Sequence, residues 1–294
     1  MNGYLNILKP PGMTSSDVVV FLRRTIKPDK IGHAGTLDPD AAGVLPIMLG
    51  KATKLFDYLN FGTKEYIAEF TFGTATDTAD AGGNKIAHND RIVSHGEILD
   101  ALPFFTGTIV QKPPMVSAVN INGKRAYSLA RQGAEVELPA RRVEIHSFVL
   151  VSNPAENRFI FKIECSKGTY IRSLCTDLAG SLGSYAYISF LLRTKSGYFD
   201  IRSSIPMSDA VILHQEGLLN RSLIALDEPI HYLPEVRINE SDFLRAVNGA
   251  NIKAPMIFDG AARVYCGSMF LGLGKMSSDG MTMSIYKVLA EQHD

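Results

Sequence analysis

Residues 32–46 constrain the fold of this chain more than any other stretch, because turn-forming and rigid residues crowd into it. The segment holds three glycines, two prolines, one histidine and two aspartates. Glycine permits backbone conformations that other residues avoid, while Pro39 fixes its own φ and favours an extended conformation at Asp38. We therefore expect one rigid, non-repetitive loop with Asp38 at its bend. Such a loop either forms a structural turn or positions a functional group, and its glycines and prolines alone leave both readings open.

The composition is that of an ordinary globular chain, long enough for one large domain and a small one. Of its 294 residues, 46% are hydrophobic and 20% are charged, and the apolar runs are too short for a membrane span. Residues 1–11 lack the basic start and long apolar core of a signal peptide. Cys165, Cys175 and Cys266 form no metal-binding spacing with the histidines, so we expect reduced cysteines in a cytoplasmic protein.

The distribution of charge is more informative than its total. The formal net charge is zero, which by itself argues against a nucleic-acid binder. Phosphate contacts need only one basic face, however. Residues 112–142 carry six basic and two acidic side chains, a local excess of +4. This segment is either a solvated face or an RNA-binding surface, and Tyr127 within it favours RNA.

Local patterns predict an alternation of strands and helices. Short apolar or alternating runs predict strands, at residues 4–8, 63–73, 143–149 and 158–165. Capping residues and helical apolar spacing predict helices, at residues 14–26, 50–59, 94–105 and 171–182. Two prolines within residues 229–236 predict a linker, and the chain beyond it consists of short strand candidates with glycine turns.

Residues 32–46 as a whole resemble the segment around the catalytic aspartate of pseudouridine synthases of the TruB family, which isomerise a uridine in the TΨC arm of tRNA. The resemblance implies that Asp38 is the catalytic carboxylate. The chain departs from the family pattern at Ala34 and Ala42, where threonine is common, and neither change touches the acid or the glycines. The resemblance covers about residues 4–200 well and the rest loosely.

Three further runs resemble active-site motifs of the family. The run Lys64-Glu65-Tyr66 implies that Tyr66 stacks on the base and can accept a proton from carbon, a core tyrosine being the alternative. The run at 168–172 implies that Arg172 pairs with Asp38 and keeps it ionised, because we expect a nearby guanidinium to reverse the rise in carboxyl pKa that burial causes. The run at 189–194 implies that Leu191 packs against the target base, although a core leucine would look the same.

Two basic residues in or beside the 32–46 segment are assigned to substrate binding. Lys9 lies in a Lys-Pro-Pro-Gly-Met-Thr-Ser run that is similar to a family motif and implies support of the active site, the alternative being a solvated turn lysine. His33 could fill the space vacated by a flipped base or stack on displaced bases, or it could be structural. Residues 73–83 resemble another family loop, in which we expect a structural role for Asp77.

Residues 123–133 are similar to the mobile insertion, or thumb, that closes over tRNA in the stand-alone bacterial enzymes. The resemblance and the local charge together assign five basic residues of this region to RNA binding. They are Lys124, Arg125, Arg131, Arg141 and Arg142.

The implied fold class is α+β: a pseudouridine synthase fold with a mixed, mainly antiparallel central sheet flanked by helices. A catalytic domain is expected at residues 1–235, with the thumb-like basic insertion at about 112–142. Residues 236–294 are expected to form a small β-rich domain that resembles the RNA-binding PUA domain attached to these synthases. A β module with only a packing role is the alternative for this last part.

The implied activity is an aspartate-dependent isomerisation in which the target base is flipped out of the RNA. Asp38 can act as the nucleophile or can start deprotonation at the sugar, and the sequence does not choose between these routes. We expect no cofactor and no metal. The expected partner is tRNA through its TΨC stem-loop, and the protein is expected to be a monomer that needs no membrane, guide RNA or protein partner.

Three other functions were weighed against this one. A guide-dependent synthase shares the aspartate loop, but the basic insertion favours the stand-alone form. A non-catalytic RNA-binding module is disfavoured by the complete set of Asp38, Tyr66 and Arg172. A glycoside hydrolase needs two cooperating carboxylates, and Asp40 is too close in sequence to Asp38 to be a convincing second one.

Overall fold

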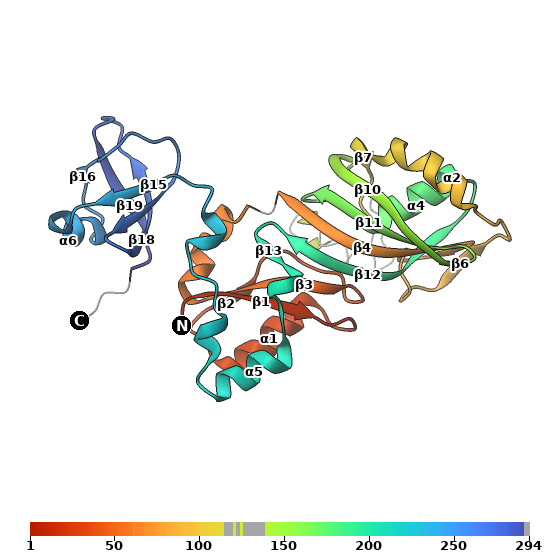
Figure 1. Ribbon diagram of the computed structural model, residues 1–294, viewed down its shortest axis with the longest axis horizontal. Coiled ribbons are helices and arrows are strands. Elements are labelled where there is room, and N and C mark those ends of the chain that lie inside the picture. Colours follow the sequence, from red (N-terminus) through yellow and green to blue (C-terminus); the bar gives the residue numbers. More distant parts are fainter. Residues whose placement is uncertain (61, 115–119, 122–123, 126–138, 291–294) are drawn as a thin grey trace.

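The computed structural model describes residues 1–60, 62–114, 120–121, 124–125 and 139–290. Their backbone forms a large sheet with helices packed on it, followed by a smaller sheet near the C-terminus (Figure 1). The fold class predicted from the sequence, α+β with a mixed and mainly antiparallel sheet, is confirmed. None of the helices in the described ranges is long and apolar enough to cross a membrane.

The large sheet has ten strands in the described part of the chain, in the order β14-β1-β3-β12-β4-β11-β10-β7, with β2 paired to β3 and β13 to β12. Its strands are β1 (Gly3–Lys9), β2 (Ile31–His33), β3 (Ala42–Leu49), β4 (Thr63–Phe72), β7 (Gly107–Gln111), β10 (Arg141–Ala155), β11 (Arg158–Ser166), β12 (Ala186–Ser196), β13 (Phe199–Asp200) and β14 (Ile205–Pro206). Neighbours run antiparallel except in the pairs β1–β14 and β3–β12, which are parallel.

Most of the helices pack on the large sheet, and the last two, within residues 240–247, belong with the smaller sheet. They are α1 (Ser15–Ile26), η1 (Gly50–Tyr58), α2 (His95–Ala101), η2 (Leu102–Phe105), α4 (Ile171–Ser181), η3 (Ile201–Ser203), α5 (Met207–Gln215), η4 (Leu219–Ser222), η5 (Glu228–Ile230), η6 (Glu240–Asp242) and α6 (Phe243–Val247). Figure 1 shows α1 and α5 side by side beneath β1, and α2 and α4 beside β10 and β11. Apolar side chains of these four helices and of the large sheet form one continuous core.

The helices predicted from capping and spacing are present, but the one at 50–59 is 3₁₀ throughout and the one at 94–105 changes from α to 3₁₀ after Ala101. Thr14 caps α1 through a reciprocal pair of bonds with Asp17, and Ser94 caps α2 in the same way with Glu97. The predicted helix at 50–59 is a 3₁₀ helix, η1, which follows directly from β3.

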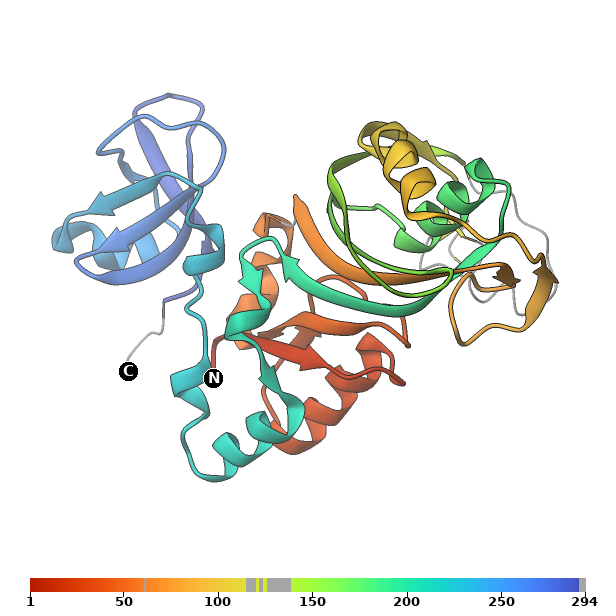
Figure 2. The ribbon, with the colours of Figure 1, turned by 45° about the vertical axis from the view of Figure 1, so that its right-hand side comes forward.

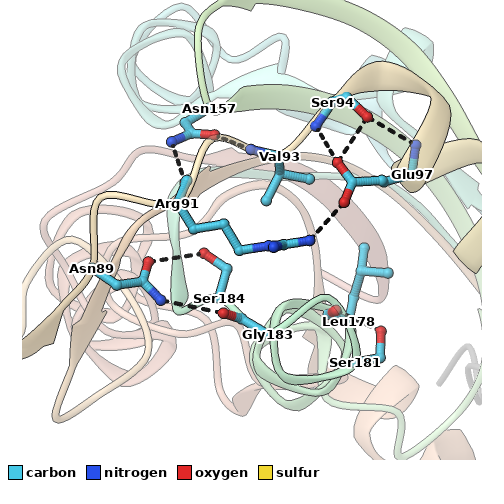
Figure 3. Close-up of polar contacts among 10 residues, drawn as sticks. All are labelled: Asn89, Arg91, Val93, Ser94, Glu97, Asn157, Leu178, Ser181, Gly183 and Ser184. Atoms are coloured by element: carbon cyan, nitrogen blue, oxygen red, sulfur yellow. Dashed lines mark hydrogen bonds and ion pairs between the residues drawn. The ribbon is translucent and has the colours of Figure 1, made fainter.

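The segment between β6 and α2 is held at three places, as Figure 3 shows. Arg91 Nη2 donates to Glu97 Oε1 at 2.6 Å, and Asn157 bonds the backbone of both Arg91 and Val93. The Asn89 side chain bonds the loop that follows α4. Because this segment continues directly from the short hairpin β5 (Thr74–Thr76) and β6 (Lys85–His88), these bonds also fix the far end of the 73–88 loop.

The second sheet has the order β15-β17-β18-β19-β16. Its strands are β15 (Glu235–Ile238), β16 (Ile252–Lys253), β17 (Ala262–Cys266), β18 (Met269–Met276) and β19 (Thr282–Val288). Figure 2 shows it beside η1, and Lys51 Nζ donates to the carbonyls of Leu289 and Ala290 across that contact. The sheet begins at Glu235, close to the predicted boundary at residue 236, and independent folding of this part stays a prediction.

A fully buried arginine fastens the 32–46 segment to the centre of the large sheet. Arg193 of β12 donates to the carbonyl of Val44 from Nε and Nη2, at 2.9 and 2.7 Å. It also donates to the carbonyls of Thr36 and Gly35, at 3.2 and 3.0 Å. Gly43 pairs with Arg193 in the parallel register of β3 and β12, and its φ of +115° is one that other residues rarely adopt.

We expect Gly43→Ala to destabilise the protein more than its backbone strain alone would. A Cβ at Gly43 would collide with the backbone carbonyl and N of Arg193, whereas a Cβ at Gly107, where φ is +88°, would meet open space. Gly107→Ala should therefore cost about 1–2 kcal/mol from φ alone, and Gly43→Ala roughly 1–3 kcal/mol more from the collision. Urea unfolding of both variants measures the difference, and equal losses would contradict the close contact between β3 and β12.

Candidate active site

Four residues that the sequence assigned to an active site line one cavity. Asp38, Tyr66, Arg172 and Leu191 all face a cavity of about 200 Å³, although they come from four different segments. The loop after β2 supplies Asp38, β4 supplies Tyr66, the first turn of α4 supplies Arg172 and β12 supplies Leu191. Their meeting place is the centre of the sheet, where β12 lies between β3 and β4.

The acid and the guanidinium form an ion pair. Arg172 Nε lies 2.9 Å from Asp38 Oδ2, and the Arg172 side chain is 4% exposed while that of Asp38 is 38% exposed. Arg172 Nη1 also donates to the carbonyl of Thr78 at 3.1 Å and lies 3.6 Å from Asp80 Oδ2. The carboxylate is therefore reachable from the cavity, while its positive partner is enclosed by protein.

Two carboxylates share this guanidinium, and that sharing affects the pKa of Asp38. Burial raises the pKa of Asp38, Arg172 and Lys9 lower it, and the neighbouring Asp80 raises it again. The net direction is upward. The expectation that Arg172 reverses the effect of burial on this pKa is wrong. The guanidinium lowers the pKa of Asp38, but burial has the larger effect, and the negative charge of Asp80 near the same guanidinium adds to it. Asp38 thus stays closer to its protonated form than an exposed aspartate.

Tyr66 is buried in β4 with its ring on the cavity wall. Burial raises the pKa of its hydroxyl to about 12, although the buried Arg193 guanidinium beside it acts in the opposite direction. At neutral pH the hydroxyl therefore keeps its proton. Tyr66 offers the cavity a flat aromatic surface and a hydrogen-bond donor, and Leu191 adds an apolar surface from the neighbouring strand β12.

Lys9 lies beneath the 32–46 segment, and its ammonium group has no N–H left to donate to a ligand. Its side chain is fully buried, and Nζ donates to the carbonyls of Pro10, Met13 and Pro39 at 2.8, 2.6 and 2.9 Å. An ammonium group has three N–H bonds, and three carbonyls use them all. The geometry therefore favours the supporting role over the substrate contact that the sequence assignment included.

The remaining basic residues are distributed around the site. His33 ends β2 and is not among the residues lining the cavity. Arg141 begins β10 with its guanidinium 4.6 Å from the ring centroid of the cavity residue Tyr170, and Arg142 is exposed. The backbone of Lys124 and Arg125 forms the short strand β9, which pairs with β8 (Asn120–Ile121), and Arg131 lies outside the described residues.

Three residues near the site were missed from the sequence. Asp80 lies in the 73–83 loop, in which the sequence singled out only Asp77. The Asp77 carboxylate accepts hydrogen bonds from the backbone and side chain of Asn84. Arg193 follows Leu191 by two positions in the same run, and Lys64 precedes Tyr66 by two positions and lines the cavity with it. On a strand, a charged residue two positions from an active-site residue lies on the same face of the sheet. This spacing could have predicted Lys64 and Arg193 from the sequence. Within the described ranges, no cluster of His, Cys, Asp and Glu side chains has the arrangement of a metal site.

Comparison of the amino-acid sequence with known proteins identifies relatives of this chain. A model of the TruB family pseudouridylate synthase N-terminal domain matches residues 23–171. A tRNA pseudouridine synthase B of Alkaliphilus oremlandii is 39% identical over 98% of both chains, and one of Clostridioides difficile is 40% identical over 97% of this chain and 98% of its own.

Solved structures show the same fold. A chain of a Cbf5-Nop10-Gar1 complex superposes with a TM-score of 0.72 at 26% identity, covering 97% of this chain and 84% of that one. A chain of an H/ACA ribonucleoprotein bound to a substrate RNA superposes with a TM-score of 0.73 at 24% identity, covering 99% and 86%. The second likeness is one of fold alone.

The shared guanidinium predicts opposite effects of two substitutions on Asp38. Asp80→Asn removes a neighbouring negative charge and should lower the pKa of Asp38, whereas Arg172→Met removes the counter-charge and should raise it. Carbon-13 NMR of protein labelled at aspartate, with Asp38→Asn to assign the signal, measures both. Asp77→Asn is the matched control, because Asp77 bonds Asn84 and not Arg172. An unchanged titration of Asp38 in Asp80→Asn would show that Asp80 does not affect the pKa of Asp38.

Proposed function

The chain belongs to the TruB family of pseudouridylate synthases, and from this premise we propose that it isomerises a uridine in the TΨC arm of tRNA to pseudouridine. The observation that carries the proposal is the ion pair of Asp38 and Arg172 at a cavity walled by Tyr66 and Leu191. The relatives at about two-fifths identity over nearly the full chain are named for tRNA, which supports that substrate.

The chemistry requires the carboxylate of Asp38 in its ionised form. The bond between the ribose C1′ and the uracil N1 breaks, the base turns, and C5 of the base joins C1′. Asp38 either attacks the sugar or removes a proton from it, and both roles need a free carboxylate. Arg172 supplies the charge that favours this form and holds Oδ2 in one orientation. No cofactor is needed for the step, since the reaction is an isomerisation.

The cavity fits a flipped base rather than a base in a helix. The target uridine lies in a folded arm, so it must leave its stack at a cost of a few kcal/mol. The Tyr66 ring and the Leu191 side chain offer stacking and apolar contact that offset this cost. Because the pKa of the Tyr66 hydroxyl is raised to about 12, we assign Tyr66 to stacking and hydrogen-bond donation rather than to proton abstraction near neutral pH.

We assign the RNA contacts to five basic residues of the 112–142 insertion, Lys124, Arg125, Arg131, Arg141 and Arg142. In this proposal His33 contacts bases displaced by the flip, and Lys9 acts only through the loop it supports. The protein is proposed to work as a monomer, without a guide RNA or a protein partner, and its cytoplasmic location stays a prediction.

A guide-dependent synthase is the second candidate, because the solved structures that superpose well are chains of Cbf5 and H/ACA complexes. The identity to these chains is 24–26%, against 39–41% to the relatives named tRNA pseudouridine synthase B. The stand-alone reading is therefore preferred, and activity of the purified protein alone separates the two.

Purified protein incubated with unmodified tRNA should form pseudouridine at one position in the TΨC arm, without added protein or guide RNA. Asp38→Asn keeps the size of the side chain but removes the reactive carboxylate, so it should abolish product while the Kd for tRNA changes by less than about threefold. Chemical mapping of pseudouridine and filter binding measure these outcomes. Product from Asp38→Asn would remove Asp38 from the mechanism, and product only with a guide RNA would favour the second candidate.

If Arg142 contacts a phosphate, Arg142→Gln should weaken tRNA binding and reduce the salt dependence of the affinity. Each lost phosphate contact should lower the slope of log affinity against log salt by about one unit. Arg202→Gln is the matched control, since Arg202 is 87% exposed and lies on η3, outside the basic segment. A slope that is the same in wild type and Arg142→Gln would place Arg142 away from the RNA.

A further inference from the structure

Lys64 is a second cation of the active-site cavity that the mechanism above does not use. It precedes Tyr66 by two residues on β4, so both side chains lie on the same face of the sheet and both line the cavity with Asp38. Arg172 is matched by Asp38 and Asp80, as its ion pairs show. Among the described residues, no carboxylate lies within ion-pair distance of the Lys64 ammonium.

The groups around Lys64 supply no negative charge either. Arg193 faces it from β12 and is itself positive, while Cys165 faces it from β11 in direct register. Burial raises the pKa of the Cys165 thiol to about 11 and that of Tyr66 to about 12, so both are neutral near pH 7. A half-buried cation without a counter-charge is unfavourable in the empty site. Its placement is explained if an anion occupies the cavity during the reaction.

We propose that Lys64 is a catalytic residue whose ammonium binds the uracil and balances the negative charge that the base carries after it leaves the ribose. This inference rests on the proposed function. The inference adds to the proposed function the group that stabilises the leaving base. Neither Asp38 nor Arg172 fills this role, since both act on the sugar side of the C1′–N1 bond.

The charge balance of the step is the same whichever route Asp38 takes. The C1′–N1 bond breaks with both electrons going to N1, so the free uracil is a monoanion with its charge spread over N1, O2 and O4. The Lys64 ammonium donates a hydrogen bond to a carbonyl oxygen of this anion and keeps its proton. An electron pair of the anion then forms the C5–C1′ bond, as the sugar either releases the Asp38 carboxylate or takes back the proton that Asp38 removed. Water then accepts the proton on C5 while N1 gains one from water, which completes the isomerisation without a cofactor.

The ionisation of Lys64 provides a readout that a structural role would not move. Burial, reinforced by Arg193, lowers the pKa of Lys64 to about 8. The ammonium is therefore present below pH 8 and is lost as the pH rises through 8. In wild type, kcat/KM should decline on the alkaline side near pH 8, because this ratio reports ionisation of the free protein.

The experiment measures single-turnover rates and kcat/KM across pH for wild type, Lys64→Met and Lys64→Arg, with unmodified tRNA as the probe. At saturating tRNA, Lys64→Met should be slower by roughly 10²-fold, the usual effect of losing one donor to a developing anion. Its Kd for tRNA should change by less than about threefold, since the charge it stabilises exists only after bond cleavage. Lys64→Arg stays charged at all accessible pH values. It should recover most of the rate and lose the alkaline decline.

Lys195→Met is the matched control, because it removes a lysine from the exposed side of the neighbouring strand β12, outside the cavity, and should match wild type. A wild-type rate in Lys64→Met, or a loss confined to KM as expected for a phosphate contact, would overturn the proposal. So would an alkaline decline that persists in Lys64→Arg, which would assign that decline to Lys9, whose pKa burial also lowers to about 8. Absence of product in wild type would instead refute the proposed function itself.

Discussion

A fully buried guanidinium holds the loop that carries Asp38, the aspartate we propose to be catalytic. Arg193 has no exposed surface, and its charge is met by the carbonyls of Gly35, Thr36 and Val44 rather than by a carboxylate. Removing such a charge from water costs several kcal/mol unless its donors are satisfied. The cost is offset only when both ends of the 32–46 segment present their carbonyls to β12. The same contact that satisfies Arg193 therefore fixes the position of Asp38.

Two carboxylates in the cavity share one guanidinium, and this sharing sets the charge balance around Asp38. Asp38 and Asp80 both approach Arg172, so the guanidinium favours ionised Asp38 without holding the pKa of that carboxyl low. A carboxylate whose pKa lies well below its ordinary value would be a weak base and a weak nucleophile. If Asp38 is the catalytic acid, as we propose, Asp80 thus preserves its reactivity while Arg172 keeps it oriented. Lys64 stands apart from this group, with Arg193 and neutral Tyr66 as its neighbours.

Local patterns in the sequence predicted individual helices and strands, whereas family resemblance supplied the fold class and the site residues, and the limits of the local patterns have a physical cause. The helical spacing after residue 171 and the capping boxes of α1 and α2 depend on neighbours within four residues, so they could be predicted. The meeting of Asp38 with Arg172 came from family resemblance, since nothing local connects residues so far apart. Asp80 and the burial of Lys9 depend on contacts between distant segments, and no periodicity encodes them.

The two strands that flank the basic insertion are bonded to the same turn that aims Arg172. Gln111, the last residue of β7, bonds both the N–H and the carbonyl of Tyr170, at 3.1 and 3.3 Å. Arg141, the first residue of β10, lies over the Tyr170 ring, and Ser173 donates to the carbonyl of Lys112 at 2.7 Å. A displacement of either end of the insertion would therefore reach the first turn of α4 through three direct contacts. Because Arg172 lies in that turn, the basic segment is physically continuous with the residue that pairs with Asp38, the acid we propose to be catalytic.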